Sequence, residues 1–145
     1  MKIFLLLDPP TITAQETKVV IVHGKPRFYK PENVTKAKEE LKKHLRPFKP
    51  EEPLDGPIEL KVTWLFPRGK RHKHLEWRTT KPDTDNLEKL LKDCMTQLGF
   101  WKDDALVVRE VVEKLWSDEP TGIALEIEIL SDRKEETNET KTTAR

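Results

Sequence analysis

Hydrophobic and polar residues alternate with a period of two along two stretches of the chain. In residues 58–66, Ile58, Leu60, Val62, Trp64 and Phe66 fall on one face, and Glu59, Lys61, Thr63 and Leu65 fall on the other. Residues 123–129 alternate in the same way, and residues 105–116 are apolar at first and mixed later. Because such alternation is typical of strands with one buried face, we expect strands at residues 58–66 and 123–129, and we also expect a long strand at residues 105–116.

The N-terminal region predicts further strands. Residues 3–7 are an unbroken apolar run, which favours a strand that is central or buried on both faces. Residues 19–22 and 27–29 flank the sequence His23-Gly24-Lys25, which indicates a β-hairpin. Gly24 supplies the positive φ angle that such a turn needs.

A first helix is predicted to begin at Pro31, which suits the first turn of a helix, and to run to about Leu45. Pro47 ends it. One face of this helix is apolar, formed by Val34, Ala37, Leu41 and Leu45, and the lysines and glutamates face water.

A second helix is predicted from just after Pro82 to the stop at Gly99. Its apolar residues recur at helical spacing and form one buried stripe of Leu87, Leu90, Leu91, Cys94, Met95 and Leu98. We expect Asp85 to be the N-cap of this helix, with Glu88 completing a capping box.

The predicted elements follow the order β-β-β-α-β-α-β-β. This order indicates an α+β fold in which two main helices pack against a mixed β-sheet. The length of 145 residues favours one domain, which we expect to span residues 1–131. Residues 132–145 are almost free of apolar side chains and are predicted to form a polar, disordered tail.

Composition narrows the class of protein. Charged residues make up 37% and hydrophobic residues 35%, which is typical of a polar globular protein. The first apolar run ends at Leu7, before Asp8, and is too short for a signal peptide or a membrane span. The single cysteine, Cys94, excludes a disulfide framework and suits a reducing cytoplasm. The net charge of +1 does not by itself indicate a nucleic-acid partner.

Acidic residues gather at both ends of the second helix. Asp83 and Asp85 lie at its entrance, and Asp104 follows its end, at the start of the next strand. If that strand lies beside the helix, the three carboxylates can meet. Mg²⁺ prefers a few carboxylate oxygens, waters and phosphate oxygens. We therefore predict a Mg²⁺ site, with Mn²⁺ as a substitute ion, at Asp83, Asp85 and Asp104, and a catalytic cation at Lys89.

Structural roles for the same residues stay open. Asp85 could cap the helix, Asp83 could shape the preceding turn, and Asp104 could belong to a polar turn with Asp103. Asp93 could serve as the i, i+4 ion-pair partner of Lys89.

A basic stretch lies directly before the acidic residues. Residues 67–81 contain six lysines and arginines but one acid, Glu76. Such a loop can pair with phosphates and stack a base, so we predict DNA contacts by Arg68, Lys70, Arg71, Lys73, Trp77, Arg78 and Lys81. The alternative is a solvated, mobile loop. His72 and His74 are weak candidates for a metal pair, because no cysteine and no helical spacing supports them.

Two motifs in this region resemble those of a known family. The segments Lys81-Pro-Asp-Thr-Asp-Asn-Leu-Glu-Lys89 and Gly99-Phe-Trp-Lys-Asp-Asp-Ala-Leu-Val107 are similar to the signature of RusA-type Holliday junction resolvases. The similarity is close over about residues 83–112 and looser over most of the chain before the tail. This sequence has Pro82 where some members of the family have arginine.

The resemblance implies a homodimeric, Mg²⁺-dependent endonuclease that cuts four-way DNA junctions by paired nicks. It implies a bacterial, prophage or phage protein of the cytoplasm. It also implies catalytic roles for Asp83, Asp85 and Asp104, and for Lys89. A dimer suits a junction, because a two-fold protein offers two sites to two symmetric strands.

Two alternative functions stay open at this point. A non-catalytic nucleic-acid-binding module would use the acids only to shape the helix, and its binding would be indifferent to divalent metal. An interaction protein that uses its sheet edge would have no affinity for DNA, which leaves the basic loop unexplained.

Overall fold

The computed structural model describes residues 1–13, 18–29 and 32–133. Its main sheet has the strand order β1-β6-β4-β5, formed by Lys2–Leu5, Gly122–Ile129, Ile58–Pro67 and Val107–Ser117. Strands β4 and β5 are parallel, and the other neighbouring pairs are antiparallel. The sheet is therefore mixed, as expected.

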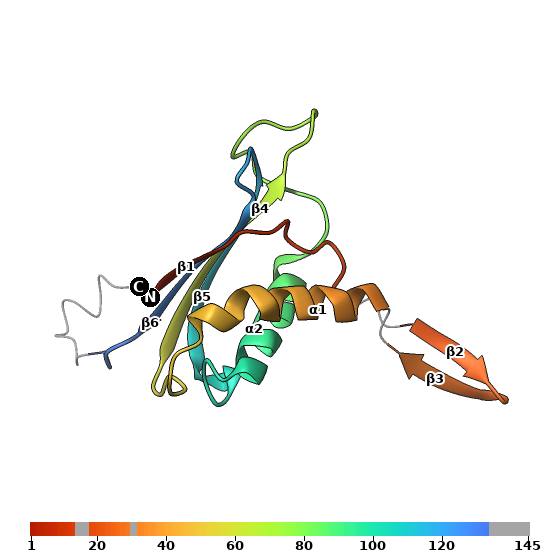
Figure 1. The fold of residues 1–145 in the computed structure, drawn as a ribbon, viewed down its shortest axis with the longest axis horizontal. Helices are drawn as coiled ribbons and strands as arrows, with labels where there is room; N and C mark the ends of the chain where they lie inside the picture. Colours follow the sequence, from red (N-terminus) through yellow and green to blue (C-terminus); the bar gives the residue numbers. More distant parts are fainter. Residues whose placement is uncertain (14–17, 30–31, 134–145) are drawn as a thin grey trace, which may run out of the picture.

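Helices α1 (Glu32–Leu45) and α2 (Thr84–Leu98) cover the same face of this sheet (Figure 1). A separate hairpin of β2 (Lys18–Val22) and β3 (Lys25–Tyr29) precedes α1. The α+β fold and the order of its strands and helices are thus confirmed. The predicted start of the first helix at Pro31 and most of the predicted tail lie outside the described residues.

The core lies between the helices and the sheet. Alternate residues of β4 face the helices and are buried, as the alternation predicted: Ile58, Leu60, Val62, Trp64 and Phe66. Helix α2 turns its predicted stripe toward them, and every member except the partly buried Leu98 is fully buried. The buried face of β4, with its period of two, and the buried stripe of α2, with its period of 3.6, therefore pack together in one hydrophobic layer.

Strand β1 differs from expectation. It pairs only with β6 among the described strands, so it is an edge strand rather than a central one. Phe4 is 40% exposed and Leu6 is 65% exposed. The Phe4 ring lies against Gly122, where an added Cβ would come within 2.6 Å of it. The apolar run is thus divided between the two faces of the sheet: Ile3 and Leu5 are buried in the core, whereas Phe4 covers a glycine on the open face.

The start of α2 also differs from expectation. The N-cap is Asp83, and Asp85 lies inside the first turn. Glu88 is 3% exposed, and its Oε1 accepts a hydrogen bond of 3.1 Å from Nε1 of Trp64. The predicted capping box is therefore wrong, because Glu88 shares the inward face of α2 with Leu91 and points into the core.

A tight connection joins α2 to β5. Gly99 ends the helix in the left-handed conformation at φ 87°, as predicted. The indole of Trp101 is buried and donates to Oγ1 of Thr96 at 2.7 Å. A 3-10 turn, η3 (Asp104–Leu106), then precedes β5, so the strand begins at Val107 and Asp104 lies in the turn.

The segment between β4 and α2 returns along the outer edge of β5. The amide of Leu75 donates to the carbonyl of Trp116 at 2.7 Å, and the amide of Arg78 donates to the carbonyl of Lys114 at 2.9 Å. The predicted basic loop is therefore anchored to the sheet by backbone hydrogen bonds. In the described part of the chain, no helix is long and apolar enough to cross a membrane.

Candidate active site

The carboxylates at the start of α2 are not used to build the helix. Asp83 occupies the N-cap position with an extended backbone, yet its side chain makes no capping hydrogen bond. Asp85 is exposed in the first turn, where an acidic side chain is favoured by the positive end of the helix dipole. Neither carboxylate has a hydrogen bond or an ion pair within the described residues. The capping role that was open for Asp85 is therefore not observed.

The two acidic residues after α2, Asp103 and Asp104, differ in their contacts. Oδ1 of Asp103 accepts a hydrogen bond of 2.8 Å from the amide of Ala105 and so caps η3. Asp104, which is half-buried, has no such bond in the described chain. Of these two carboxylates, that of Asp104 is therefore the one without a structural hydrogen bond among the described residues, and its predicted role as a metal ligand stays a prediction.

Lys89 of α2 is influenced by the charge of Asp104. Its Nζ lies 3.1 Å from Oδ1 of Asp93, the i, i+4 contact that the spacing allowed. The hydrogen bond to Asp93 raises the pKa of Lys89, and the negative charge of Asp104 raises it further. Lys89 thus stays protonated at neutral pH and lies within electrostatic reach of Asp104.

The three aspartates do not form a closed metal cage. Among the residues that the structure describes, no group of three or more His, Cys, Asp or Glu side chains could hold a metal ion. Their chemistry still suits Mg²⁺, which is commonly bound by one or two carboxylates with waters and substrate phosphates. The roles of Asp83, Asp85 and Asp104 as joint ligands stay a prediction.

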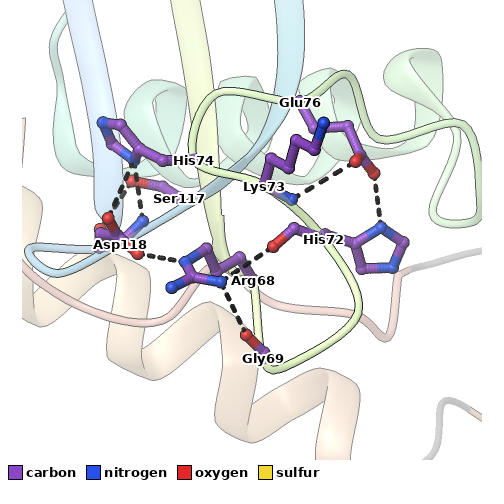
Figure 2. Close-up of polar contacts among 8 residues, drawn as sticks. All are labelled: Arg68, Gly69, His72, Lys73, His74, Glu76, Ser117 and Asp118. Atoms are coloured by element: carbon purple, nitrogen blue, oxygen red, sulfur yellow. Dashed lines mark hydrogen bonds and ion pairs between the residues drawn. The ribbon is translucent and has the colours of Figure 1, made fainter.

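Arg68 organises the base of the basic loop (Figure 2). It forms an ion pair with Asp118, in the turn between β5 and β6, and its Nη1 donates to the carbonyl of His72 at 3.0 Å. The amide of Asp118 in turn donates to Nδ1 of His74 at 3.0 Å. Nδ1 of His72 contacts the carboxylate of Glu76. Both histidines therefore have structural partners, and they do not form a metal pair with each other.

Trp116 on β5 is the platform for the rest of the loop. The His72 ring stacks on its indole with 4.0 Å between centroids, and the Arg78 guanidinium lies 4.4 Å from the indole centroid. Arg78 also lies 4.2 Å from the centroid of Phe66. Its burial lowers the pKa of the guanidinium. Arg68 and Arg78 are thus engaged in ordering the loop.

The other predicted DNA-contacting residues are exposed. They are Lys70, Arg71, Lys73, Trp77 and Lys81. Trp77 is 62% exposed and pairs with Leu115, whose neighbour across the parallel ladder is Leu65. Because paired residues share a face, Trp77 lies on the sheet face away from α1 and α2. The structure therefore does not bring Trp77 together with the carboxylates of α2.

One residue near the site was missed by the sequence analysis. Lys114 of β5 donates from Nζ to the carbonyls of Thr80 and Pro82, at 2.8 Å each. The negative charge of Asp83 acts on it and raises its pKa, against the larger lowering caused by burial. The available signal was the alternation of β5, which places Lys114 on the same face as Val112 and Trp116.

Comparison with known proteins shows the family to which the chain belongs. The family model for the endodeoxyribonuclease RusA matches residues 9–129. This chain belongs to the RusA family. The family resemblance of the acidic motifs is thereby confirmed, and the matched range includes the basic loop, α2 and η3.

Two relatives place this RusA-family chain more closely. It is 33% identical to the crossover junction endodeoxyribonuclease rusA of Lactococcus phage r1t, over 83% of this chain and 92% of the relative. It is also 36% identical to the uncharacterized protein YqaN of Bacillus subtilis strain 168, over 50% of this chain and 58% of that protein.

Proposed function

We propose that this protein is a metal-dependent endonuclease that resolves four-way (Holliday) DNA junctions during recombination and repair. The observation that carries the proposal is a set of carboxylates without structural hydrogen bonds in the described part of the chain, close to a lysine and following an ordered basic loop. Asp83 does not cap its helix, Asp104 leaves capping to Asp103, and Lys89 lies in the field of Asp104. The similarity to a phage crossover junction endodeoxyribonuclease supports the same substrate.

The residues divide the chemistry between them. Asp83, Asp85 and Asp104 would hold Mg²⁺, or Mn²⁺ in its place. A bound divalent cation neutralises phosphate charge and supplies an activated water. Lys89 carries a positive charge that stabilises the negative charge developing on the phosphodiester. Without metal, the same carboxylates repel a phosphate, so productive contact with DNA depends on the ion.

The basic loop would provide affinity for the junction. Lys70, Arg71, Lys73 and Lys81 are exposed and can pair with phosphates, whereas Arg68 and Arg78 fix the loop from which they project. Trp77 offers an exposed aromatic face for stacking. In this proposal the predicted DNA-contacting residues therefore have two complementary tasks, direct contact with DNA and ordering of the loop.

The proposed assembly is a homodimer that acts in the cytoplasm of a bacterial cell, encoded by the chromosome or by a phage. A four-way junction has two symmetric strands to cut, and a two-fold dimer presents one acidic site to each. Paired nicks then release two linear duplexes.

The test is cleavage of a synthetic four-way junction with Mg²⁺, with Mn²⁺ and with a chelator. We expect paired nicks only when metal is present. Asp85→Asn should abolish cleavage and keep or strengthen junction binding, because it removes a charge that repels phosphate. A folded protein that binds the junction equally with and without metal and never nicks it would instead be a non-catalytic binding module.

A further inference from the structure

Two cations hold the backbone that leads into α2. Nζ of Lys114 donates to the carbonyls of Thr80 and Pro82, at 2.8 Å each. Between them, Nε of Arg78 donates to the carbonyl of Lys81 at 3.1 Å. Three consecutive carbonyls outside any helix or strand therefore find charged donors, which are stronger partners than neutral ones. We call residues 80–82 the lead-in segment.

Packing fixes both cations in place. Lys114 pairs with Trp64 across the parallel ladder and so lies on the helix-facing side of β5. It is partly buried, and burial lowers its pKa, as it does for Arg78. Arg78 is held over the rings of Phe66 and Trp116. The lead-in segment is thus attached directly to β5 through Lys114, and through Arg78 to the aromatic rings of Phe66 and Trp116 in the sheet.

Asp83 is the first residue after this clamp. Its backbone is extended at φ −73° and ψ 150°, and no capping hydrogen bond restrains its side chain. The direction of the Asp83 carboxylate therefore depends on how the preceding peptide is fixed, and that peptide contains the carbonyl of Pro82. The charge of Lys114 also acts directly on Asp83.

We propose that Lys114 is a positioning residue for the acidic site, which aims Asp83 by clamping the lead-in segment and places a positive charge beside it. This inference rests on the proposed nuclease function. It goes beyond it by assigning a role in the reaction to a strand residue outside both acidic motifs. A shift of about 1 Å in a reacting group can cost up to about 100-fold in rate, so a clamp of this kind is catalytically significant.

The decisive variants are Lys114→Met, which removes the donors and the charge, and Lys114→Arg, which keeps both. The matched control is Lys61→Met, on the open face of the neighbouring strand β4, where Lys61 pairs with Glu59 at 3.7 Å. We expect Lys114→Met to slow single-turnover junction cleavage by about tenfold or more and to raise the Mg²⁺ concentration for half-maximal cleavage. Metal-free junction affinity should stay within about twofold, since the exposed loop cations are unchanged. Lys114→Arg should recover most of the rate.

Hydrogen exchange gives a readout independent of activity. Amides of residues 80–86 should exchange faster in Lys114→Met than in the wild type or in Lys61→Met, with the rest of the sheet unchanged. Wild-type exchange at residues 80–86 in Lys114→Met would overturn the clamp, and so would a rate loss that only follows the fraction of unfolded protein. A wild-type protein that cuts no junction would overturn the proposed function instead. Hydrogen exchange at residues 80–86 would then still show whether Lys114 clamps the lead-in segment.

Discussion

Nε1 of Trp64 donates a hydrogen bond of 3.1 Å to Oε1 of Glu88 inside the core, and Oε2 of Glu88 has no partner within the described chain. Burial is the main cause that raises the pKa of Glu88, to about 7. The charge of Glu110 raises it further, while the hydrogen bond from Trp64 and the charge of Lys92 lower it. The carboxyl group is therefore held in its neutral form over much of the acidic range.

This relationship predicts a loss of stability as pH rises. Glu88 titrates at about 7 in the folded protein but near the ordinary 4.5 when unfolded, so the folded state binds more protons between these values. The free energy of unfolding should fall across that window, by at most about 3 kcal/mol from this group. Urea unfolding of the wild type and Glu88→Gln at pH values across the window measures it. The variant should lose this part of the slope, and an unchanged slope would contradict the assignment.

The two acids of η3 should behave differently when they are changed singly. Asp104→Asn should reduce junction cleavage by about 100-fold or more, with little effect on stability. Asp103→Asn should keep cleavage within a few-fold and change stability by no more than about 1 kcal/mol, because asparagine also caps well. Cleavage rates and thermal unfolding of both variants provide the comparison. Equal loss of cleavage in the two would remove the distinction between them.

Lys89 and Lys92 form a second matched pair on α2. Lys92 forms an ion pair with Glu110, whereas the negative charge of Asp104 acts on Lys89. Lys89→Met should slow cleavage by roughly 100-fold, the loss typical of one electrostatic donor in a reaction site. Lys92→Met should leave the rate nearly unchanged. Single-turnover kinetics at saturating protein separates these outcomes from a change in DNA affinity.

The exposed loop cations should control the salt dependence of binding. Replacement of Lys70 and Arg71 together by alanine should reduce the slope of log affinity against log salt by about two, roughly 0.9 for each lost phosphate contact. Lys2→Ala, at an exposed ion pair with Glu126, serves as the control. Metal-free binding isotherms at several salt concentrations test this. The same slope in the double variant and the wild type would exclude the two residues from the interface.

Local periodicity was enough to predict the central elements. The alternation in β4 and the helical stripe in α2 each describe a face that must be buried, so pattern and packing agree. The position of β1 could not be predicted in this way. An unbroken apolar run is compatible with a central strand or with an edge strand, and the two are distinguished by a long-range contact, the pairing of β1 with β6.

Contacts between distant residues explain the other differences. The spacing of Asp85 and Glu88 fits a capping box, but Trp64 lies 24 positions away and offers Glu88 a buried donor. Lys114 contacts carbonyls 34 and 32 positions away, and nothing in its local sequence indicates them. The acidic motifs could be located from the chain alone, whereas the groups that hold them depend on the tertiary fold.

The path of the basic loop also affects whether the main sheet can pair with a strand of another molecule. By pairing with β5, residues 75–78 fill backbone positions that would otherwise accept a strand from a neighbouring molecule. In the described chain this leaves β1 as the side of the main sheet open to such a strand, and β1 is only four residues long. The basic loop therefore also protects the edge of β5 from pairing with strands of other molecules. Shortening this loop should make the protein prone to aggregate.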